Sequence, residues 1–218
     1  NGEAAKPTSD KAGWLYVGNP GPDARQDEGV RTKTARMCGP VREAFAGSFI
    51  LVHGGEGTRS RETAIRTAMD WMRYAKGVPR IMAAEDVTDR HIAQYNLLLF
   101  GRPEENALLK RIMPELPIQV RDGAVELDGR RYDLENHGLW MIYPNPLAPM
   151  RSVVVHCGVR WGRQLPENHV YDMLPDFIVY NAEVDYDNTN QFLCAGFFDM
   201  CWQLSEDLTW TIAPGDPR

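Results

Sequence analysis

Apolar runs and helix-like patterns alternate along the middle of the chain. The first apolar run, residues 49–52, leads into a loop that contains three glycines, a pattern typical of a strand followed by a turn. In the segment after this loop, apolar residues recur at helical spacing, and Ser60 stands where an N-cap is expected. The predicted strands are residues 49–52, 79–84 and 96–101, and the predicted helices are residues 60–76, 87–95 and 102–113.

This order of elements predicts the fold class. Strands that alternate with helices form a mostly parallel sheet with helices on both faces, so we expect an α/β domain. The pattern changes after Pro117, where Asp122-Gly123 and Asp128-Gly129 separate short alternating stretches. Asp-Gly pairs favour tight hairpin turns, which predicts a β-meander inserted into the domain. Three further strand candidates follow within residues 138–180.

The first part of the chain differs in composition from the rest. It is rich in glycine, proline and charged residues, and it contains little that a core could bury. Trp14, Leu15 and Tyr16 are the exception. We therefore expect residues 1–37 to be an irregular arm or linker, and residues 38–218 to form a single α/β domain.

Composition and charge exclude several classes of protein. The 218 residues carry a net charge of −6 without a dense run of lysine or arginine, which argues against nucleic-acid partners. No apolar run approaches the roughly 20 residues that a membrane-spanning helix needs. The four cysteines form no C-x-x-C pair, which disfavours zinc and haem sites, so no cofactor or metal is expected. The cysteines are compatible with disulfide pairing or with four buried thiols.

The candidate site lies where the predicted strands end, because ligands of open parallel sheets bind beyond the carboxyl ends of the strands. The helix predicted from Pro103 would direct its unpaired N–H groups at this edge, and Arg102 adds a charge suited to a carboxylate or phosphate. An anionic ligand is therefore expected. Two alternatives stay open: Glu104 and Glu105 already satisfy this helix end, or the strand ends hold only ordinary turn residues. The expected ligand-binding residues are His53, Gly54, Arg102, Asn106 and Asn145.

Motifs for catalysis are weak in this chain. The glycine loop at residues 53–58 matches no phosphate-binding fingerprint, and its His-Gly-Gly start lacks the G-x-S-x-G motif that an α/β-hydrolase requires. Cys157 is a candidate nucleophile, because it ends a predicted strand beside His156. Neighbouring strand residues point to opposite faces, so His53 is the better candidate base if the strands are adjacent.

Several segments together resemble a known family. They are F-G-R-P-E-E-N at residues 100–106, I-Y-P-N-P-L at residues 142–147, L-P-D-F at residues 174–177 and A-G-F-F-D at residues 195–199. In this order, and over roughly residues 38–203, the chain resembles the C-terminal α/β region of large secreted bacterial proteins with prolyl-oligopeptidase-like or esterase-like α/β-hydrolase domains. The resemblance implies an accessory domain, with the catalytic serine, acid and histidine outside this chain. A start at Asn1 agrees with a piece of such a protein.

One expected function and two alternatives follow. We expect a non-catalytic accessory domain of a secreted or periplasmic hydrolase, which binds or assembles with the hydrolase domain of the same protein or with a partner subunit. The first alternative is a hydrolase in its own right, with Cys157 as the nucleophile. The second is an interaction subunit of a stable complex, whose N-terminal arm becomes ordered on its partner.

Overall fold

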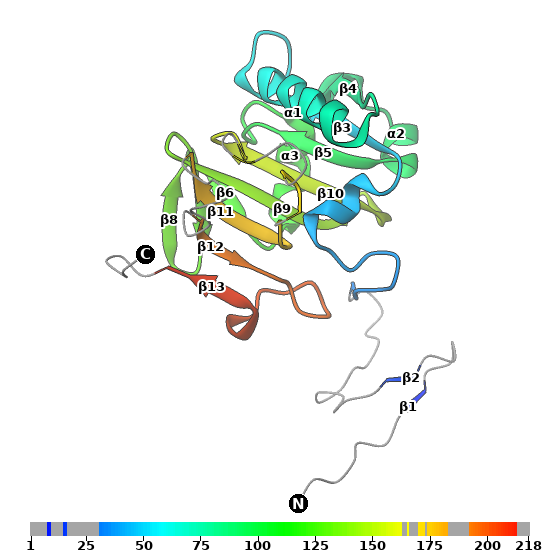
Figure 1. Cartoon of the computed structure of the whole chain (residues 1–218), viewed down its shortest axis with the longest axis vertical. Coiled ribbons are helices and arrows are strands. Elements are labelled where there is room, and N and C mark those ends of the chain that lie inside the picture. The colour runs from blue at the N-terminus through cyan, green and yellow to red at the C-terminus, as the bar shows by residue number, and fades with distance from the viewer. Residues whose placement is uncertain are drawn as a thin grey trace, which may run out of the picture. The chain divides into compact units, whose positions relative to one another are not determined.

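The computed structural model divides the chain into two units, Asn1–Val30 and Arg31–Arg218. Figure 1 shows the strands and helices of the described residues. In the first unit, β1 (Thr8–Ser9) pairs with β2 (Leu15–Tyr16) in an antiparallel ladder. All further description concerns the second unit. The structure describes residues 8–9, 15–16, 31–162, 165, 170–172, 174–182 and 192–212.

Residues 31–37, which the sequence assigned to the arm, belong to the second unit. Lys33 donates its backbone N–H to the carbonyl of Met200 at 2.8 Å. Met37 is buried in the core of the unit. The compact unit therefore begins at Arg31, seven residues before the boundary expected from composition.

The second unit is built on an eight-stranded mixed sheet with the strand order β13-β12-β11-β9-β10-β5-β3-β4 (Figure 1). Neighbours among β4, β3, β5 and β10 run parallel, and every pair from β10 to β13 runs antiparallel. The strands are β3 (Phe49–His53), β4 (Arg80–Ala83), β5 (Asn96–Phe100), β9 (His137–Asn145), β10 (Ala148–Gly158), β11 (Phe177–Asn181), β12 (Phe192–Gly196) and β13 (Thr209–Thr211).

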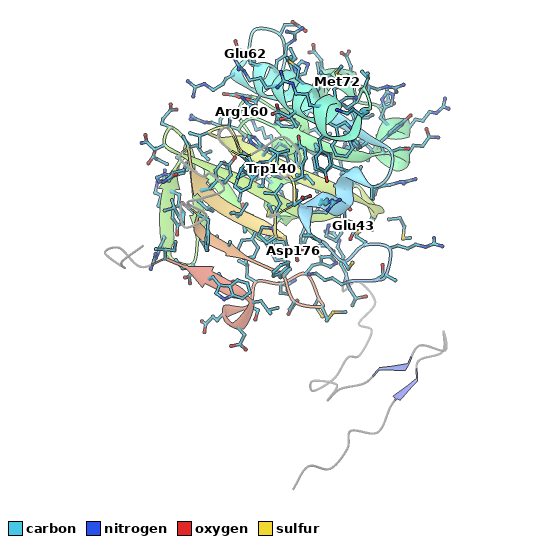
Figure 2. All side chains as sticks on the ribbon, viewed as in Figure 1. Glu43, Glu62, Met72, Trp140, Arg160 and Asp176 are labelled. Carbon is cyan, nitrogen blue, oxygen red and sulfur yellow. The ribbon has the colours of Figure 1, made fainter. Side chains whose placement is uncertain are left out.

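The centre of this sheet is covered on both faces, as its continuous apolar runs predict. Leu97 to Phe100 in β5 and Val153 to Val155 in β10 are all buried. Trp140 in β9 is a large, fully buried side chain at the middle of the unit (Figure 2). These buried strands fix the positions of the loops that follow β3, β5 and β10.

The α-helices of the described residues are α1 (Arg59–Ala75), α2 (Asp89–Gln94) and α3 (Ala107–Ile112), and the 3-10 helices are η1 (Val41–Phe45), η2 (Ala84–Asp86), η3 (Met113–Glu115) and η5 (Glu206–Leu208). Helix α1 packs against β3, β4 and β5 through small side chains such as Ala64 and Ala68. Its N-cap is Thr58, whose hydroxyl accepts the N–H of Arg61. The predicted N-cap, Ser60, is the second residue of the helix.

The two Asp-Gly pairs form the turns of a separate three-stranded sheet, β6 (Gln119–Arg121), β7 (Ala124–Leu127) and β8 (Arg130–Asp133). Asp122 and Asp128 have φ values of 47° and 52°, and each is followed by a glycine with positive φ. Two residues with positive φ fit the hairpin turns that Asp-Gly favours. This meander lies between α3 and β9 in the chain.

The predicted fold class, a mostly parallel sheet with helices on both faces, is wrong. The molecule is mostly β, with a large mixed sheet, a small sheet and few helices among the described residues. The prediction failed in part because β9 and β11 join the sheet antiparallel, although their apolar runs look like those of parallel strands. Strands β12 and β13, which were not predicted, extend this antiparallel half. The second and third predicted helices were also too long, since α2 and α3 each have six residues, whereas α1 has the predicted length.

Candidate functional site

A cavity of about 300 Å³ opens at the carboxyl ends of β5 and β10 and at the N-terminal turn of α1. It lies at the edge of the parallel half of the sheet, which is the usual place for a ligand in such sheets. Its floor and walls come from four separate parts of the chain. The lining residues are Arg59, Ser60, Thr63, Gly101, Arg102, Glu105, Leu134, Glu135, His156 and Gly158.

His156 is the most deeply buried ionisable side chain of the cavity wall. Its Nε2 lies 3.2 Å from the hydroxyl of Tyr180, which itself donates to the carbonyl of Val159 at 2.8 Å. Because that hydroxyl hydrogen is already used, His156 must carry its proton on Nε2 and donate to Tyr180. Burial lowers the pKa of His156 to about 3. The imidazole is therefore neutral at physiological pH.

The rim of the cavity holds three charged side chains in one ion-pair cluster. Arg102 donates a hydrogen bond to Oε1 of Glu135, and Nη1 of Arg59 lies 3.5 Å from Oε2 of the same carboxylate. The hydrogen bond and charge of Arg102, helped by Arg59, hold the pKa of Glu135 below its ordinary value. Two guanidinium groups from different elements thus converge on one carboxylate at the mouth of the cavity.

Ser60 lies in the wall of the cavity, but its hydroxyl serves the fold. It accepts the N–H of Gly54 at 3.0 Å and lies 2.8 Å from the hydroxyl of Thr58. Thr58 donates its own hydrogen to the carbonyl of Gly55 at 2.7 Å, so Ser60 is the donor between the two hydroxyls. Both hydroxyls are engaged in holding the loop between β3 and α1.

Gly101 lets the loop after β5 pass close to α1. It has a φ of 101°, and a Cβ atom at this position would lie 2.7 Å from Cβ of Ser60 and 2.8 Å from Oε2 of Glu105. A larger residue would be strained in that conformation and would also enter the cavity. The glycine therefore sets the depth of the cavity between β5 and α1.

Of the five residues predicted to bind a ligand, Arg102 lines the cavity. His53 and Gly54 lie at the end of β3 beside it, in structural roles. Nδ1 of His53 accepts the N–H of Gly55 at 3.1 Å. Gly54 is needed for close packing, because a Cβ atom there would lie 2.2 Å from the carbonyl oxygen of Glu105.

Asn106 is fully buried, and all the hydrogen-bonding capacity of its amide is used. Its Oδ1 accepts the N–H groups of Leu108 and Leu109, each at 3.1 Å. Its Nδ2 donates to the carbonyls of Val52 and Phe100. Asn106 thus caps α3 and ties together the ends of β3 and β5, so the helix begins after it rather than near Pro103.

Asn145 lies at the opposite end of the central strands from the cavity. Strand β9 runs antiparallel to β10, so Trp140 pairs with His156 while Asn145 pairs with Ala148. The expectation that Asn145 joins the other predicted residues required β9 to be parallel, and the observed direction corrects it. Oδ1 of Asn145 accepts the N–H of Leu147 within the β9–β10 hairpin.

Cys157 does not have the surroundings of a nucleophile. It is fully buried, and its thiol donates to the carbonyl of Gly101 at 2.8 Å. Burial raises the pKa of Cys157 far above its ordinary range. A thiol without access to the thiolate form is a poor nucleophile.

Sequence reasoning missed Arg59 and Glu135 as residues of the cavity. Arg59 follows the glycine loop and could have been included as the first residue of the following helix. Glu135 comes from the turn after β8, and no local pattern connects that turn with the end of β5. Its place depends on how the meander folds back.

Within the part of the chain that the structure describes, no group of three or more histidine, cysteine, aspartate or glutamate residues is placed to hold a metal ion. No described helix is long and apolar enough to cross a membrane. Comparison of the chain with protein-family models, curated proteins and solved structures found no match.

Proposed function

We propose that the protein is a non-catalytic binding domain that takes a small carboxylate or phosphate ligand in the cavity at the carboxyl edge of β5 and β10. The observation that carries this proposal is the convergence of Arg59 and Arg102 on the Glu135 carboxylate at the mouth of the cavity. A guanidinium pair that holds one carboxylate has the geometry to hold another. The position also agrees with where open sheets bind ligands.

The side chains of the cavity support binding rather than catalysis. A general base works best with a pKa near the working pH, whereas the pKa of His156 is about 3. The hydroxyl of Ser60 is committed to the loop before α1. The thiol of Cys157 is buried and protonated. These observations also argue against the alternative of a Cys157 hydrolase.

The wider role proposed is that of an accessory domain of an exported hydrolase, with that hydrolase domain or a partner subunit as its partner. This part rests on the order of the family-like segments from residue 100 to residue 199, together with the lack of a nucleophile motif. The sequence of the intact gene product tests it. A hydrolase domain in the same protein supports the proposal, and its absence from the gene and its neighbours counts against it.

Titration calorimetry of the full chain with phosphate, acetate and succinate tests the binding proposal. We expect at least one of these anions to bind, and Arg102→Ala to weaken that binding by about tenfold to a hundredfold, the value of a lost charged hydrogen bond. Arg131→Ala is the matched control, because Arg131 pairs with the exposed Glu126 in the meander. Binding that is equal in the two variants, or absent for all three anions, would overturn the proposal.

A further inference from the structure

Strand β13 forms one outer edge of the large sheet (Figure 1). Phe197 donates its N–H to the carbonyl of Leu208 at 2.9 Å, and Ile212 donates to Leu193 at 3.1 Å. In an antiparallel ladder, hydrogen-bonded residue pairs alternate with pairs that share no hydrogen bond. Leu208 and Ile212 belong to hydrogen-bonded pairs, so Trp210, midway between them and paired with Ala195, is the residue of β13 whose backbone faces β12. The backbone groups of the residues on either side of Trp210 face away from the sheet.

Three backbone groups of β13 are therefore presented outward. Thr209 donates its N–H to the carbonyl of Glu206, so only the C=O group of Thr209 faces outward without a partner. Thr211 presents both its N–H and its C=O. Within the described part of the chain, no other residue bonds to these three groups. Such groups on an edge strand are a template for a further strand.

Exposed apolar side chains gather in the loop and strand beside this edge. Phe197 and Trp210 lie on the same face of the β12–β13 ladder, with ring centroids 6.2 Å apart and perpendicular planes. They are 40% and 53% exposed, although both are large aromatic residues. Met200 and Leu204 in the connecting loop are also exposed. Aromatic residues and methionine of this kind are enriched where proteins meet.

The charge of this edge is negative. Residues 197–212 contain Asp199, Glu206 and Asp207 and no lysine or arginine. Arg130 donates to the carbonyl of Ile212, so one positive charge lies at the end of β13, after the strand and away in sequence from Glu206 and Asp207 at its start. Lys33 is held in a buried ion pair with Asp176.

We propose that β13 is the docking edge for an extended segment of a partner protein in which lysine or arginine residues alternate with apolar residues. The segment would add to β13 as a ninth strand, with bonds to the outward groups of Thr209 and Thr211. Its apolar side chains would cover Phe197 and Trp210, and its cations would face Glu206 and Asp207. A second copy of this chain would bring no lysine or arginine within residues 197–212 to complement these carboxylates.

A peptide titration of the full chain tests this proposal independently of the anion cavity. The probe is a ten-residue peptide of alternating lysine and valine with blocked ends, and the control probe has glutamate in place of lysine. Binding is followed by the fluorescence of the chain and by NMR. We expect the basic peptide to bind at least tenfold more tightly than the acidic one.

Two sets of variants locate the binding at β13. Thr211→Pro removes the outward N–H and is tolerated at a strand edge, so we expect about a tenfold loss of affinity for the basic peptide. Thr211→Val, which keeps the N–H, is the matched control and should bind like the parent chain. The double change Glu206→Lys and Asp207→Lys should reverse the preference between the two peptides. It also tests the proposal if Thr211→Pro fails to fold, which circular dichroism would reveal.

Three results would overturn the proposal. The first is equal affinity of the folded Thr211→Pro and Thr211→Val variants for the basic peptide. The second is a peptide preference that the charge-reversed variant does not change. The third is a dimer of the parent chain, seen by sedimentation, that Thr211→Pro or the charge reversal abolishes, because this would make a second copy the occupant of the edge.

Discussion

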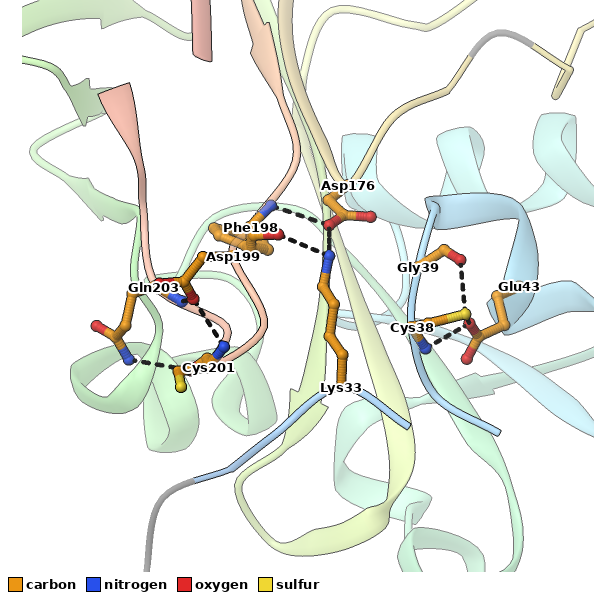
Figure 3. Close-up of polar contacts among 9 residues, drawn as sticks. All are labelled: Lys33, Cys38, Gly39, Glu43, Asp176, Phe198, Asp199, Cys201 and Gln203. Atoms are coloured by element: carbon orange, nitrogen blue, oxygen red, sulfur yellow. Dashed lines mark hydrogen bonds and ion pairs between the residues drawn. The ribbon is translucent and has the colours of Figure 1, made fainter. Parts of the chain in front are cut away.

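Lys33 and Asp176 lie 143 positions apart in sequence and form a buried ion pair, with Nζ 2.5 Å from Oδ2 (Figure 3). The same ammonium donates to the carbonyl of Phe198 at 2.8 Å, and the N–H of Phe198 donates back to Asp176 at 2.9 Å. Gly39 packs directly against this carboxylate, where no larger residue would fit. The cluster fastens the start of the second unit to the loops beside β11 and β12.

The first prediction concerns this ion pair. Replacement of Lys33 by Met leaves the Asp176 carboxylate buried without its cation, and we expect the free energy of unfolding at pH 7 to fall by about 3–5 kcal/mol. Urea denaturation measures it. Arg31→Met is the matched control, because Arg31 pairs with Glu115 at an exposed position and should cost about 1 kcal/mol or less. Equal losses in the two variants would contradict the prediction.

The same pair should give the stability a recognisable pH dependence. Burial raises the pKa of Asp176 above 3.8, although Lys33 acts to lower it. Between 3.8 and the raised pKa, the folded state binds more protons than the unfolded state, so this group makes the protein less stable as pH rises through that range. Without Lys33, the pKa of Asp176 rises further. The deficit of Lys33→Met should therefore shrink as the pH is lowered from 7 towards 4, whereas that of Arg31→Met should not show this recovery.

A second prediction tests the ion-pair cluster at the rim of the cavity. Arg102→Gln removes the main cause of the lowered pKa of Glu135, so that pKa should rise towards 4.5. Arg59 remains and should prevent a complete return. NMR titration of the side-chain carboxyl carbon measures the change, with Arg131→Gln as the control that leaves Glu135 alone. An unchanged titration in Arg102→Gln would mean that the two side chains do not interact in solution.

A third prediction concerns thiol reactivity. Cys157 and Cys194 are buried, and burial raises the pKa of each, so neither should react with iodoacetamide in the native protein at pH 8. Cys38 is exposed and should be modified, but slowly, because desolvation and Glu43 raise its pKa. Mass spectrometry after digestion identifies the modified residues. Denaturation should make all the cysteines react, and rapid native labelling of Cys157 would restore the case for a cysteine nucleophile.

A fourth prediction separates a structural role of Asn106 from a ligand-binding role. Asn106→Ala removes a helix cap and leaves buried carbonyls without donors, so the protein should lose about 2–4 kcal/mol of stability. Glu104→Ala, an exposed change in the same loop, should stay within about 0.5 kcal/mol of the parent. Thermal unfolding compares the two variants. An Asn106→Ala protein of normal stability that has lost anion binding would show that the amide meets the ligand.

Local features of this fold are encoded in short stretches of sequence, whereas strand direction is not. The cores of β3 and β5, the body of α1 and the Asp-Gly turns were predictable, because apolar spacing and turn residues are local signals. The direction of β9 was not, since an apolar run looks the same whether its neighbours run parallel or antiparallel. Because β9 is antiparallel to β10, Asn145 lies at the end of the strands that is opposite to the cavity.

The candidate site was predictable only in part for the same reason. Arg102 could be placed at a strand end from its position after the apolar run of β5. Asn106 looked like a ligand-binding residue because an N-cap and a ligand contact use the same polar side chain. Glu135 depends on the fold of a distant insertion. His156 stands at a predicted strand end but was not among the expected ligand-binding residues, although it lines the cavity.

The turn that follows the meander β6–β8 supplies a charged residue of the cavity entrance that is not part of the large sheet. The meander is an excursion of the chain between α3 and β9, and it contributes Leu134 and Glu135 to the cavity from the turn where it ends. Most of the other lining residues are anchored by the large sheet or by α1. Replacement of the exposed Glu135 would therefore reverse the charge at the entrance while the packing of the sheet stays intact, whereas Leu134 is fully buried. Among descendants of one ancestral domain, ligand preference would then diverge through this insertion sooner than through the strands.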